Sequence, residues 1–282
     1  MRHLKLCLMA FLLLLCGCKN KPANDWEAMD LNGKVKQIIE QQFLAEIRFG
    51  KVEKGDLYRS EGWDCIYYFN EKGRFSKVSQ LDAMSDELSY TTYTYNQHDT
   101  LTIETSYDAE GEISEKSVFT YDEKGRVAQV VIFNNTDNLT GSRLYEYNDK
   151  ANTSTICAYS PRGRLLNKAE NKLDKNGNPT EFKLYNEENQ LVNFRKEVHD
   201  RDGRLKMLTI LTPDAQTVMT VTFQYDKNGN LILQEGSDEN GEKFIPKRYE
   251  YKFDAKGNWT QKIEFEGDEA KTVTERQIEY YE

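Results

Sequence analysis

Histidines are the residues in this sequence best suited to proton transfer at neutral pH, and there are three of them. His3 stands near the start of the chain, and His98 lies among polar residues that favour a turn. His199 takes a place that tyrosine occupies elsewhere in a recurring phrase, which is typical of packing. The sequence shows no Ser, His and Asp arrangement, no phosphate-binding loop and no Cys/His cluster with metal spacing. We therefore expect a protein without catalytic residues or a cofactor.

Two segments that begin at Asp174 and Asp226 read DKNGN and share the oxygen-bearing side chains of calcium loops. Neither has the spacing or the terminal Glu of an EF-hand. Related segments along the chain carry Lys or Arg where a ligand would be needed. The side chains that favour tight turns explain the same letters, so we expect no metal site.

Aromatic residues are the strongest candidates for binding, because tyrosine stacks on sugars and contacts proteins well. They recur at regular intervals, which is also what a packing ladder requires, so both interpretations stay open. The candidate binding residues are Tyr95, Tyr121, Tyr147, Tyr225 and Tyr251. Thr100 is a second kind of candidate, since Asp99-Thr100-Leu101 resembles a short acceptor for O-linked glycans in bacterial envelope proteins.

The first residues predict export. Arg2 and Lys5 precede an apolar run over 6–15, which is too short to span a bilayer as a helix. The segment Leu15-Cys16-Gly17-Cys18 resembles the lipobox of bacterial lipoproteins, which implies that the signal is 1–17 and that Cys18 carries the lipid. Residues 18–32 are then a tether and 33–282 the folded domain. Lys19 resembles the residue found there in lipoproteins sent on to the outer membrane.

Charge and cysteine content limit the partners and the crosslinks. The net charge of -9 and the mean hydropathy of -0.78 argue against nucleic acid and against an anionic lipid surface as a partner of the folded body. Membrane attachment would depend on the lipid. Cys65 and Cys157 are separated by about seven strands, or roughly 30 Å along a sheet, which is beyond disulfide reach. We therefore expect two buried free thiols.

One seven-residue phrase is written repeatedly along the chain. Examples are YDEKGRV at Tyr121, YSPRGRL at Tyr159 and YDKNGNL at Tyr225. Counting weaker copies, the first residue of each phrase, here called the anchor, recurs at alternating gaps of 12 and 14 residues from Phe69 to Tyr225. A fixed period of 26 residues indicates a repeat architecture in which each unit packs on its neighbours.

Each phrase predicts a tight turn between two strands. In D-x-x-G, Asp suits the first position of a type I turn, and Gly suits a left-handed residue that forms a G1 bulge. Where Gly is missing, Asp99, Asp137 and Asn189 tolerate that conformation. Ala151 and Ala215 do not, so we expect those two turns to be of another type.

The segments between turns are rich in Tyr, Phe, Val, Ile and Thr, which favours strands. The sequence predicts an all-β protein: an antiparallel meander of about 16–18 strands, with one helical turn near Trp26 to Met29. Because every gap is even and side chains alternate along a strand, all anchors are expected on one face. A sheet of this size curls. We expect it to coil as a single layer with the anchor face inward or packed on another copy.

The phrases YDEKGRV, YDKNGNL and YSPRGRL resemble the tyrosine-aspartate (YD) repeats of the Rhs family, and LNGKVKQIIEQQF (31–43) resembles the entry of small bacterial lipoproteins with such repeats. The resemblance covers 31–282 and implies a long antiparallel sheet that spirals. Large members form shells around a toxic cargo. This chain shows neither a cargo domain nor the self-cleaving region, so only the sheet is carried over.

These observations favour a non-enzymatic, lipid-anchored protein of the cell envelope, with the outer membrane as the expected location. It would present its sheet for protein binding or scaffolding. The contact would be made through the polar face, opposite the anchors, or through the open final strand, since an unpaired edge invites strand addition. The alternative is a glycan-binding module that uses the aromatic side chains of the repeat ladder. These two functions are not separated by the sequence.

Overall fold

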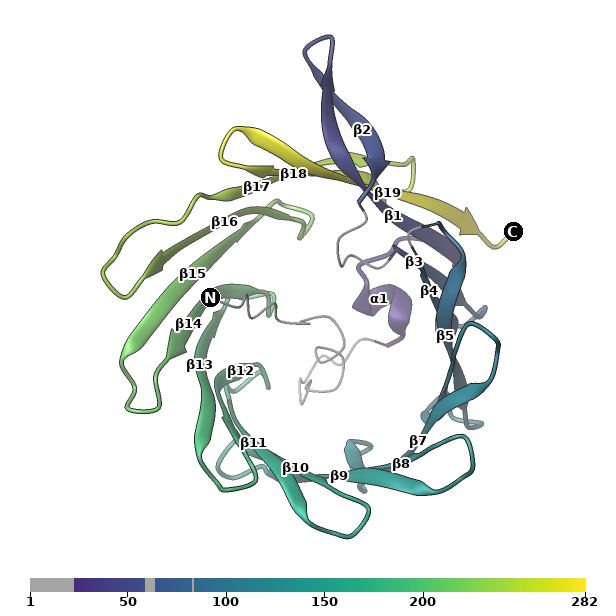
Figure 1. Cartoon of the computed structure of the whole chain (residues 1–282), viewed down its shortest axis with the longest axis vertical. Coiled ribbons are helices and arrows are strands. Elements are labelled where there is room, and N and C mark those ends of the chain that lie inside the picture. The colour runs from purple at the N-terminus through teal and green to yellow at the C-terminus, as the bar shows by residue number, and fades with distance from the viewer. Residues whose placement is uncertain (1–22, 59–63, 83) are drawn as a thin grey trace.

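The computed structural model describes residues 23–58, 64–82 and 84–282 (Figure 1). The predicted signal 1–17 and the predicted lipidation site Cys18 lie outside these ranges. Within them, no helix is both long and apolar enough to cross a membrane.

The described residues form one short helix, α1 (Asp25–Ala28), and nineteen strands. The strands are β1 (Val35–Arg48), β2 (Lys51–Leu57), β3 (Asp64–Phe69), β4 (Phe75–Leu81), β5 (Glu87–Tyr95), β6 (Leu101–Tyr107), β7 (Ile113–Tyr121), β8 (Val127–Phe133), β9 (Leu139–Asn148), β10 (Thr153–Tyr159), β11 (Leu165–Leu173), β12 (Pro179–Tyr185), β13 (Leu191–His199), β14 (Leu205–Leu211), β15 (Thr217–Tyr225), β16 (Leu231–Asp238), β17 (Lys247–Phe253), β18 (Trp259–Glu266) and β19 (Glu269–Tyr280). The predicted all-β fold and the helical turn at Trp26 are confirmed.

The sheet closes on itself. From β3 to β19 each strand pairs antiparallel with the next, and β1 pairs with β19 on one side and with β3 on the other. Eighteen strands thus form a ring, which Figure 1 shows in projection. The predicted coiling of a single layer is confirmed. The expectation of an open final strand is wrong, because β19 has a partner on both sides.

The second half of β1 leaves the ring with β2 as a hairpin. Arg48 and Lys51 pair across a two-residue loop, Phe49-Gly50, in which both residues have positive φ. This is the conformation of a type I′ turn. One side of the hairpin packs on the outer side of β18 and β19, where Ala45 and Val52 contact the cluster of Ile263, Phe265 and Val273. Beyond that contact the hairpin projects from the ring (Figure 1).

The repeated phrase forms the turns as predicted. In the turn after β7, Gly125 N–H donates to the Asp122 carbonyl at 2.9 Å, and Gly125 has φ 73°. Asp99, Asp137 and Asn189 replace Gly with φ between 55° and 59°. Ala215 was expected to change the turn type, and it does not: its N–H donates to the Thr212 carbonyl at 2.9 Å and its φ is 66°. A left-handed alanine is strained by about 1–2 kcal/mol.

The turn at Ala151 is different, as predicted. Its N–H donates to the side chain of Asn148 at 3.0 Å, and Asn152 takes the left-handed conformation.

The turns gather at two ends of the ring, which we call the odd rim and the even rim. The odd rim holds the turns that follow β3, β5, β7, β9, β11, β13, β15 and β17, and the even rim holds those that follow β4, β6, β8, β10, β12, β14, β16 and β18. This assignment follows directly from the antiparallel order of the strands. The two rims therefore present different sets of turn residues.

The anchors do not share one face, contrary to the prediction. Opposite residues in the β7–β8 ladder are Phe119 with Val130 and Lys116 with Phe133, so Tyr121 and Phe133 project from different faces. In the β8–β9 ladder Val130 is opposite Arg143, which places Tyr147 on the face of Tyr121. Anchors at the odd rim therefore point one way and anchors at the even rim the other.

A second bulge beside each turn explains the difference. Tyr121 is opposite Val127, but Thr120 is opposite Gln129, so Ala128 is an extra residue. One extra residue moves the following side chains to the other face. The same shift occurs beside turns of the even rim, as between Leu184 and Tyr185 and between Ser106 and Tyr107. With one extra residue beside each turn, the even number of residues between anchors places consecutive anchors on opposite faces of the sheet.

The odd-rim anchors face the interior of the ring. Phe69 packs with Phe75 at 5.0 Å between ring centroids and contacts Trp26 of α1, which lies inside the ring (Figure 1). The even-rim anchors lie outside among charged pairs such as Lys183 with Glu181 at 2.8 Å. The inner face contributes most of the buried hydrophobic residues, while Leu81, Phe194, Leu211, Ile263, Phe265 and Val273 are buried on the outer face.

Cys65 and Cys157 form no disulfide with each other, as predicted, although each is half-buried. Cys65 lies on the inner face opposite Glu40, whereas Cys157 is opposite Leu144 on the outer face. Burial raises the pKa of the Cys65 thiol to about 11, so this thiol stays protonated at neutral pH.

Candidate functional site

The segment predicted as a tether is partly folded into the ring. Asn24 caps α1 by accepting from the Glu27 N–H at 3.0 Å, and its amide donates to the Lys72 carbonyl at 3.0 Å. Trp26 donates from Nε1 to the Val35 carbonyl at 2.8 Å. These bonds hold α1 against the inner face at the odd rim.

Asn258, in the turn after β17, holds the segment that follows α1 against the inner face of the ring. Its Oδ1 accepts from the Asn32 N–H at 2.7 Å, and its Nδ2 donates to the Asn32 carbonyl at 2.8 Å and to Tyr280 Oη at 2.7 Å. The side chain is almost fully buried. The Asn258 side chain thus bonds both backbone groups of Asn32, as a neighbouring strand would, and joins two segments that are far apart in sequence.

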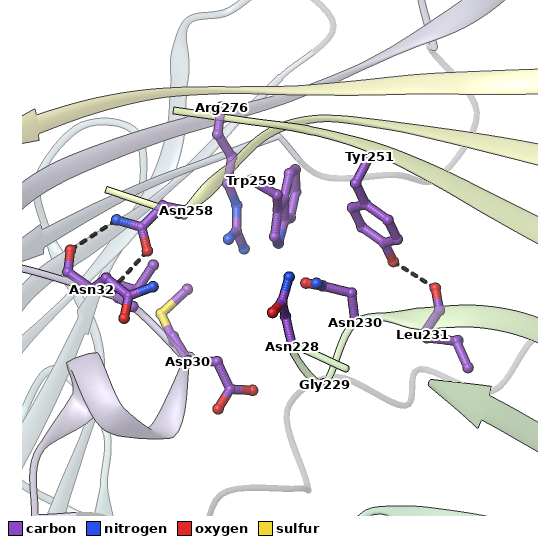
Figure 2. A pocket seen from close by; sticks show the side chains of 13 residues that line it. Asp30, Asn32, Asn228, Gly229, Asn230, Leu231, Tyr251, Asn258, Trp259 and Arg276 are labelled. Atoms are coloured by element: carbon purple, nitrogen blue, oxygen red, sulfur yellow. Dashed lines mark hydrogen bonds between the residues drawn. The ribbon is translucent and has the colours of Figure 1, made fainter. Parts of the chain in front are cut away.

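A cavity of about 450 Å³ lies between this fastened segment and the turns after β15 and β17. Figure 2 shows its polar side chains pointing toward one another across the space. Asp30 and Asn32 come from the segment after α1, Asn228 and Asn230 from the turn after β15, and Tyr251, Trp259 and Arg276 from the wall. The volume is within the range of small-molecule sites.

Trp259 and Arg276 form the wall of the cavity. The Arg276 guanidinium lies over the Trp259 ring at 3.6 Å, and its Nε donates to Glu40 at 2.6 Å. Tyr251 meets the edge of Trp259 at 6.1 Å between ring centroids. Burial lowers the pKa of the neighbouring Lys262 ammonium, which lies 5.4 Å from the Trp259 ring. The wall is thus aromatic and cationic.

The opposite side of the cavity supplies amides and a carboxyl group. The Asn230 amide donates to Asp226 at 2.9 Å, which fixes its orientation. The side chain of Asn228 is exposed and points into the space (Figure 2). Partial burial raises the pKa of the Asp30 carboxyl, and the Arg204 guanidinium opposes that shift. Both donors and acceptors therefore face the cavity.

Tyr251 is one of the predicted binding residues, and it lies in this cavity. Its hydroxyl donates to the Leu231 carbonyl at 2.8 Å, so the ring rather than the hydroxyl faces a ligand. The other predicted tyrosines make the same bond to the adjacent strand: Tyr95 to Phe75, Tyr121 to Leu101, Tyr147 to Val127 and Tyr225 to Leu205, at 2.6 to 3.0 Å. These half-buried rings form a ladder inside the odd rim.

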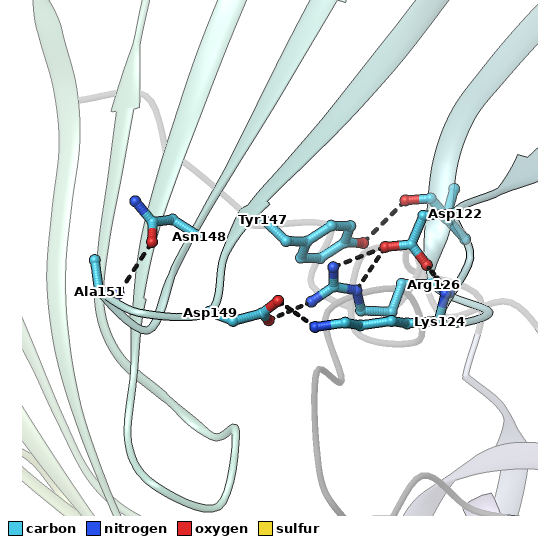
Figure 3. Close-up of polar contacts among 8 residues, drawn as sticks. Asp122, Lys124, Arg126, Tyr147, Asn148, Asp149 and Ala151 are labelled. Atoms are coloured by element: carbon cyan, nitrogen blue, oxygen red, sulfur yellow. Dashed lines mark hydrogen bonds and ion pairs between the residues drawn. The ribbon is translucent and has the colours of Figure 1, made fainter.

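Tyr147 lines a second cavity of about 190 Å³ beside the unusual turn after β9. The Arg126 guanidinium lies 4.0 Å above its ring and bonds both Asp122 and Asp149, at 2.8 and 2.6 Å (Figure 3). Lys124 also pairs with Asp149 at 2.5 Å. Because these charges neutralise one another, the network serves to order neighbouring turns. The structure does not bring Tyr147 and Tyr251 into one site.

The remaining candidates lie apart from both cavities. Thr100 belongs to the turn after β5, where its N–H donates to the Asn96 side chain at 3.1 Å. His98 is exposed in the same turn, whereas His199 is nearly buried at the end of β13, with Nε2 3.6 Å from Glu197. The strand that precedes His98, β5, and the strand that ends at His199, β13, lie on opposite sides of the ring (Figure 1). The described residues contain no group of three acidic, His or Cys side chains placed to hold a metal ion.

Glu104 is a partly buried carboxyl group on the inner face, opposite Tyr93. Burial raises its pKa to about 7, and Glu115 acts in the same direction, while Arg143 opposes the shift. A raised folded-state pKa means that folding favours the protonated form. The contribution of Glu104 to stability is therefore most favourable below the unfolded pKa near 4.5, and it is lost as the pH rises through about 7.

We expect Glu104→Gln to stabilise the protein by about 1–2 kcal/mol at pH 8.5 and to have little effect at pH 4.5, because the amide removes the cost of a buried charge. Urea unfolding at the two pH values measures this. Glu110→Gln, in the exposed turn after β6, is the control and should change neither value. Equal stabilisation by Glu104→Gln at both pH values would show that its ionisation does not matter.

The sequence did not indicate the principal cavity residues. Trp259 lies directly after a turn of the repeat, and Arg276 lies in the last strand, where no repeated phrase marks it. Asn228 and Asn230 were recognisable as turn residues, but nothing in the sequence indicated that they lie beside Trp259 and Arg276. The available signal was Trp259 itself, the last residue of the phrase at Phe253, where other copies of the phrase have a smaller residue.

No family model and no curated protein matches this chain. Solved structures similar to it include a porin-like protein from Bacteroides uniformis, at 11% identity over 88% of this chain and 99% of that chain, with a TM-score of 0.34. Another is a porin-like protein from Bacteroides vulgatus, at 10% identity over 88% and 98%, with a TM-score of 0.32. A third is the TcdB2-TccC3-Cdc42 structure, at 11% identity over 80% of this chain and 15% of that one, with a TM-score of 0.27. The chain is a β-rich repeat protein.

Proposed function

We propose that this protein is a non-enzymatic binding protein of the cell envelope that holds a carbohydrate in the odd-rim cavity. The observation that carries the proposal is the cavity itself, in which aromatic rings face amides and a carboxyl group. Sugars offer hydroxyl groups to amide and carboxyl partners and apolar faces to aromatic rings. The proposed likeness to YD-repeat lipoproteins agrees with the turns and with the ladder of tyrosines.

Two features support binding in preference to a purely structural cavity. Asn228 keeps an exposed amide in the space instead of bonding its own turn. Arg276 uses Nε for Glu40, which leaves its other nitrogens facing the cavity in Figure 2. A ligand that accepts from these groups would reach both sides at once.

A glycan array probed with the folded domain tests the proposal, followed by calorimetry with the oligosaccharide that binds best. Asn228→Ala should weaken binding at least several-fold while leaving stability unchanged, because its side chain is exposed. Asn240→Ala is the matched control: it occupies the same turn position on the even rim, and both asparagine N–H groups bond the turn Asp at 2.8–2.9 Å. Binding to no glycan, or equal losses in the two variants, would disprove the carbohydrate site.

The lipid anchor at Cys18 is a separate part of the proposal. Mass spectrometry of the protein extracted from envelope fractions should show acylation that Cys18→Ser removes, and fractionation should place the protein in the outer membrane. An unmodified chain beginning after another cleavage site would rule out the anchor.

A further inference from the structure

Exposed apolar side chains recur on the outer side of the even rim. Leu88, Leu166, Val192, Val218 and Phe244 are all exposed, and their positions differ by multiples of the 26-residue repeat. Leu88, Leu166, Val192 and Val218 are each the second residue of an odd-numbered strand, next to an even-rim turn, and Phe244 lies in the connection between β16 and β17. Since isolated exposed apolar residues are ordinary, it is their repetition at one structural position that requires an explanation.

For the four strand residues, that position is the extra residue of the bulge beside the turn. Tyr185 is opposite Leu191 and Leu211 is opposite Thr217, which leaves Val192 and Val218 unpaired in the ladder. Elsewhere the same position often holds Ser or Thr, whose hydroxyl bonds a backbone carbonyl across the hairpin. The examples are Ser76 with Tyr68, Thr102 with Thr94, Thr140 with Ile132, Thr180 with Lys172 and Thr260 with Lys252.

Leu88, Leu166, Val192 and Val218 therefore replace a side chain that would satisfy the local structure. They lose a hydrogen bond and place a hydrophobic surface in water, so neither local structure nor packing explains them. The hairpin of β1 and β2 adds Phe49 at its tip, fully exposed and with φ 52°. Asn or Gly is favoured at such a position, and a bulky residue there is uncommon.

The two rims also differ in charge. The even-rim turns include DAEGEI at Asp108, NEENQL at Asn186 and DENGEK at Asp238, whereas the odd-rim turns include DEKGRV at Asp122 and DRDGRL at Asp200. Counting the residues between consecutive strands over the eight turns of each rim, the even rim has twelve acidic and three basic residues, and the odd rim has ten of each. The net charge of the chain, -9, is thus concentrated on the even rim.

We propose that the even rim, with the hairpin, is a docking surface for a basic protein that presents apolar side chains between its cationic groups. Acidic turns attract and orient such a partner, and the spaced apolar residues supply the contacts. The surface is distinct from the carbohydrate cavity, which lies at the odd rim.

The position of α1 argues against the anchoring membrane as the occupant. Asn24 is bonded to the turn after β3, at the odd rim. If Cys18 carries the lipid, as proposed above, only six residues separate it from this contact, a reach of about 20 Å. The membrane would then lie near the odd rim, and the even rim would face away from it. Its acidic turns would in any case repel anionic lipid.

A synthetic amphipathic peptide of lysine and leucine is a suitable probe for the folded protein, with binding followed by fluorescence anisotropy. The double variant Val192→Ser/Val218→Ser should weaken binding by about tenfold without changing the net charge. Val198→Ser is the matched control: it is 45% exposed, against 56% for Val192, and lies near the odd-rim end of the same strand, β13. It should bind the peptide as the unchanged protein does.

Salt dependence and two alternative partners complete the test. Glu187→Gln/Glu188→Gln should weaken binding and reduce its sensitivity to salt. Equal losses in the Val192→Ser/Val218→Ser and Val198→Ser proteins would overturn the proposal. So would equal binding of a glutamate and leucine peptide, binding to lipid vesicles in preference to the peptide, or a dimer in light scattering that the double variant dissociates.

Discussion

Ile38→Ala should lower the free energy of unfolding by about 2–4 kcal/mol, because it leaves a cavity in the most enclosed part of the ring. Ile38 has 0% exposure and lies opposite both Ile278 and Tyr67, so it supports the two ladders that close the sheet. It packs with Val35 and Phe69 under α1. Urea unfolding followed by circular dichroism measures the loss as a change in midpoint.

Ile47→Ala provides the control within the same strand. Ile47 is 72% exposed in the hairpin that leaves the ring, so its truncation should change stability by less than about 0.5 kcal/mol. If the two variants lost similar stability, the closing ladders would not be where the ring is held together.

Arg276→Met should destabilise the fold by about 3 kcal/mol, since it leaves the partly buried Glu40 carboxylate without its partner. The pair joins β19 to β1 across the same closure, and the substitution also removes the guanidinium from the Trp259 ring. Arg276→Met should bind carbohydrate more weakly as well. Thermal or urea unfolding gives the first effect, and calorimetry at a temperature where the variant is folded gives the second.

Arg248→Met is the matched control on the outer face. Its guanidinium lies 3.9 Å above the Phe265 ring and pairs with Glu250, but both charged groups are largely exposed. Exposed pairs contribute about 0–1 kcal/mol, so the loss should be small. Adding Glu40→Gln to Arg276→Met should restore part of the stability, and failure to do so would argue against an unpaired carboxylate as the cause.

Local chemistry made much of the fold predictable. The repeat at 26 residues, the strands, the type I turns and the substitution of Gly by Asp or Asn all follow from side-chain preferences within a few residues. Ala215 shows the limit of that reasoning. Its neighbours on β14 and β15 hold the hairpin tightly enough to force a left-handed alanine, because the ladder outweighs a strain of about 1–2 kcal/mol.

The facing of the anchors was not predictable from spacing alone. Ala128 looks like any strand residue, and nothing in its side chain indicates that it is left unpaired beside the turn. Closure was equally hidden, since the partners of β1 and β19 are at opposite ends of the sequence. The cavity depends on that closure, which explains why Tyr251 was identified through its repeat while Trp259 and Arg276 were not.

The bulges and the β1–β19 ladder together limit how the diameter of the ring can change. One 26-residue module contributes two strands, so its gain or loss keeps the strand count even and lets β1 and β19 meet antiparallel as before. Each module would alter the circumference by about 10 Å. Wider and narrower versions of the same ring are therefore accessible by duplication or loss of whole modules, without any change in the pairing of β1 with β19.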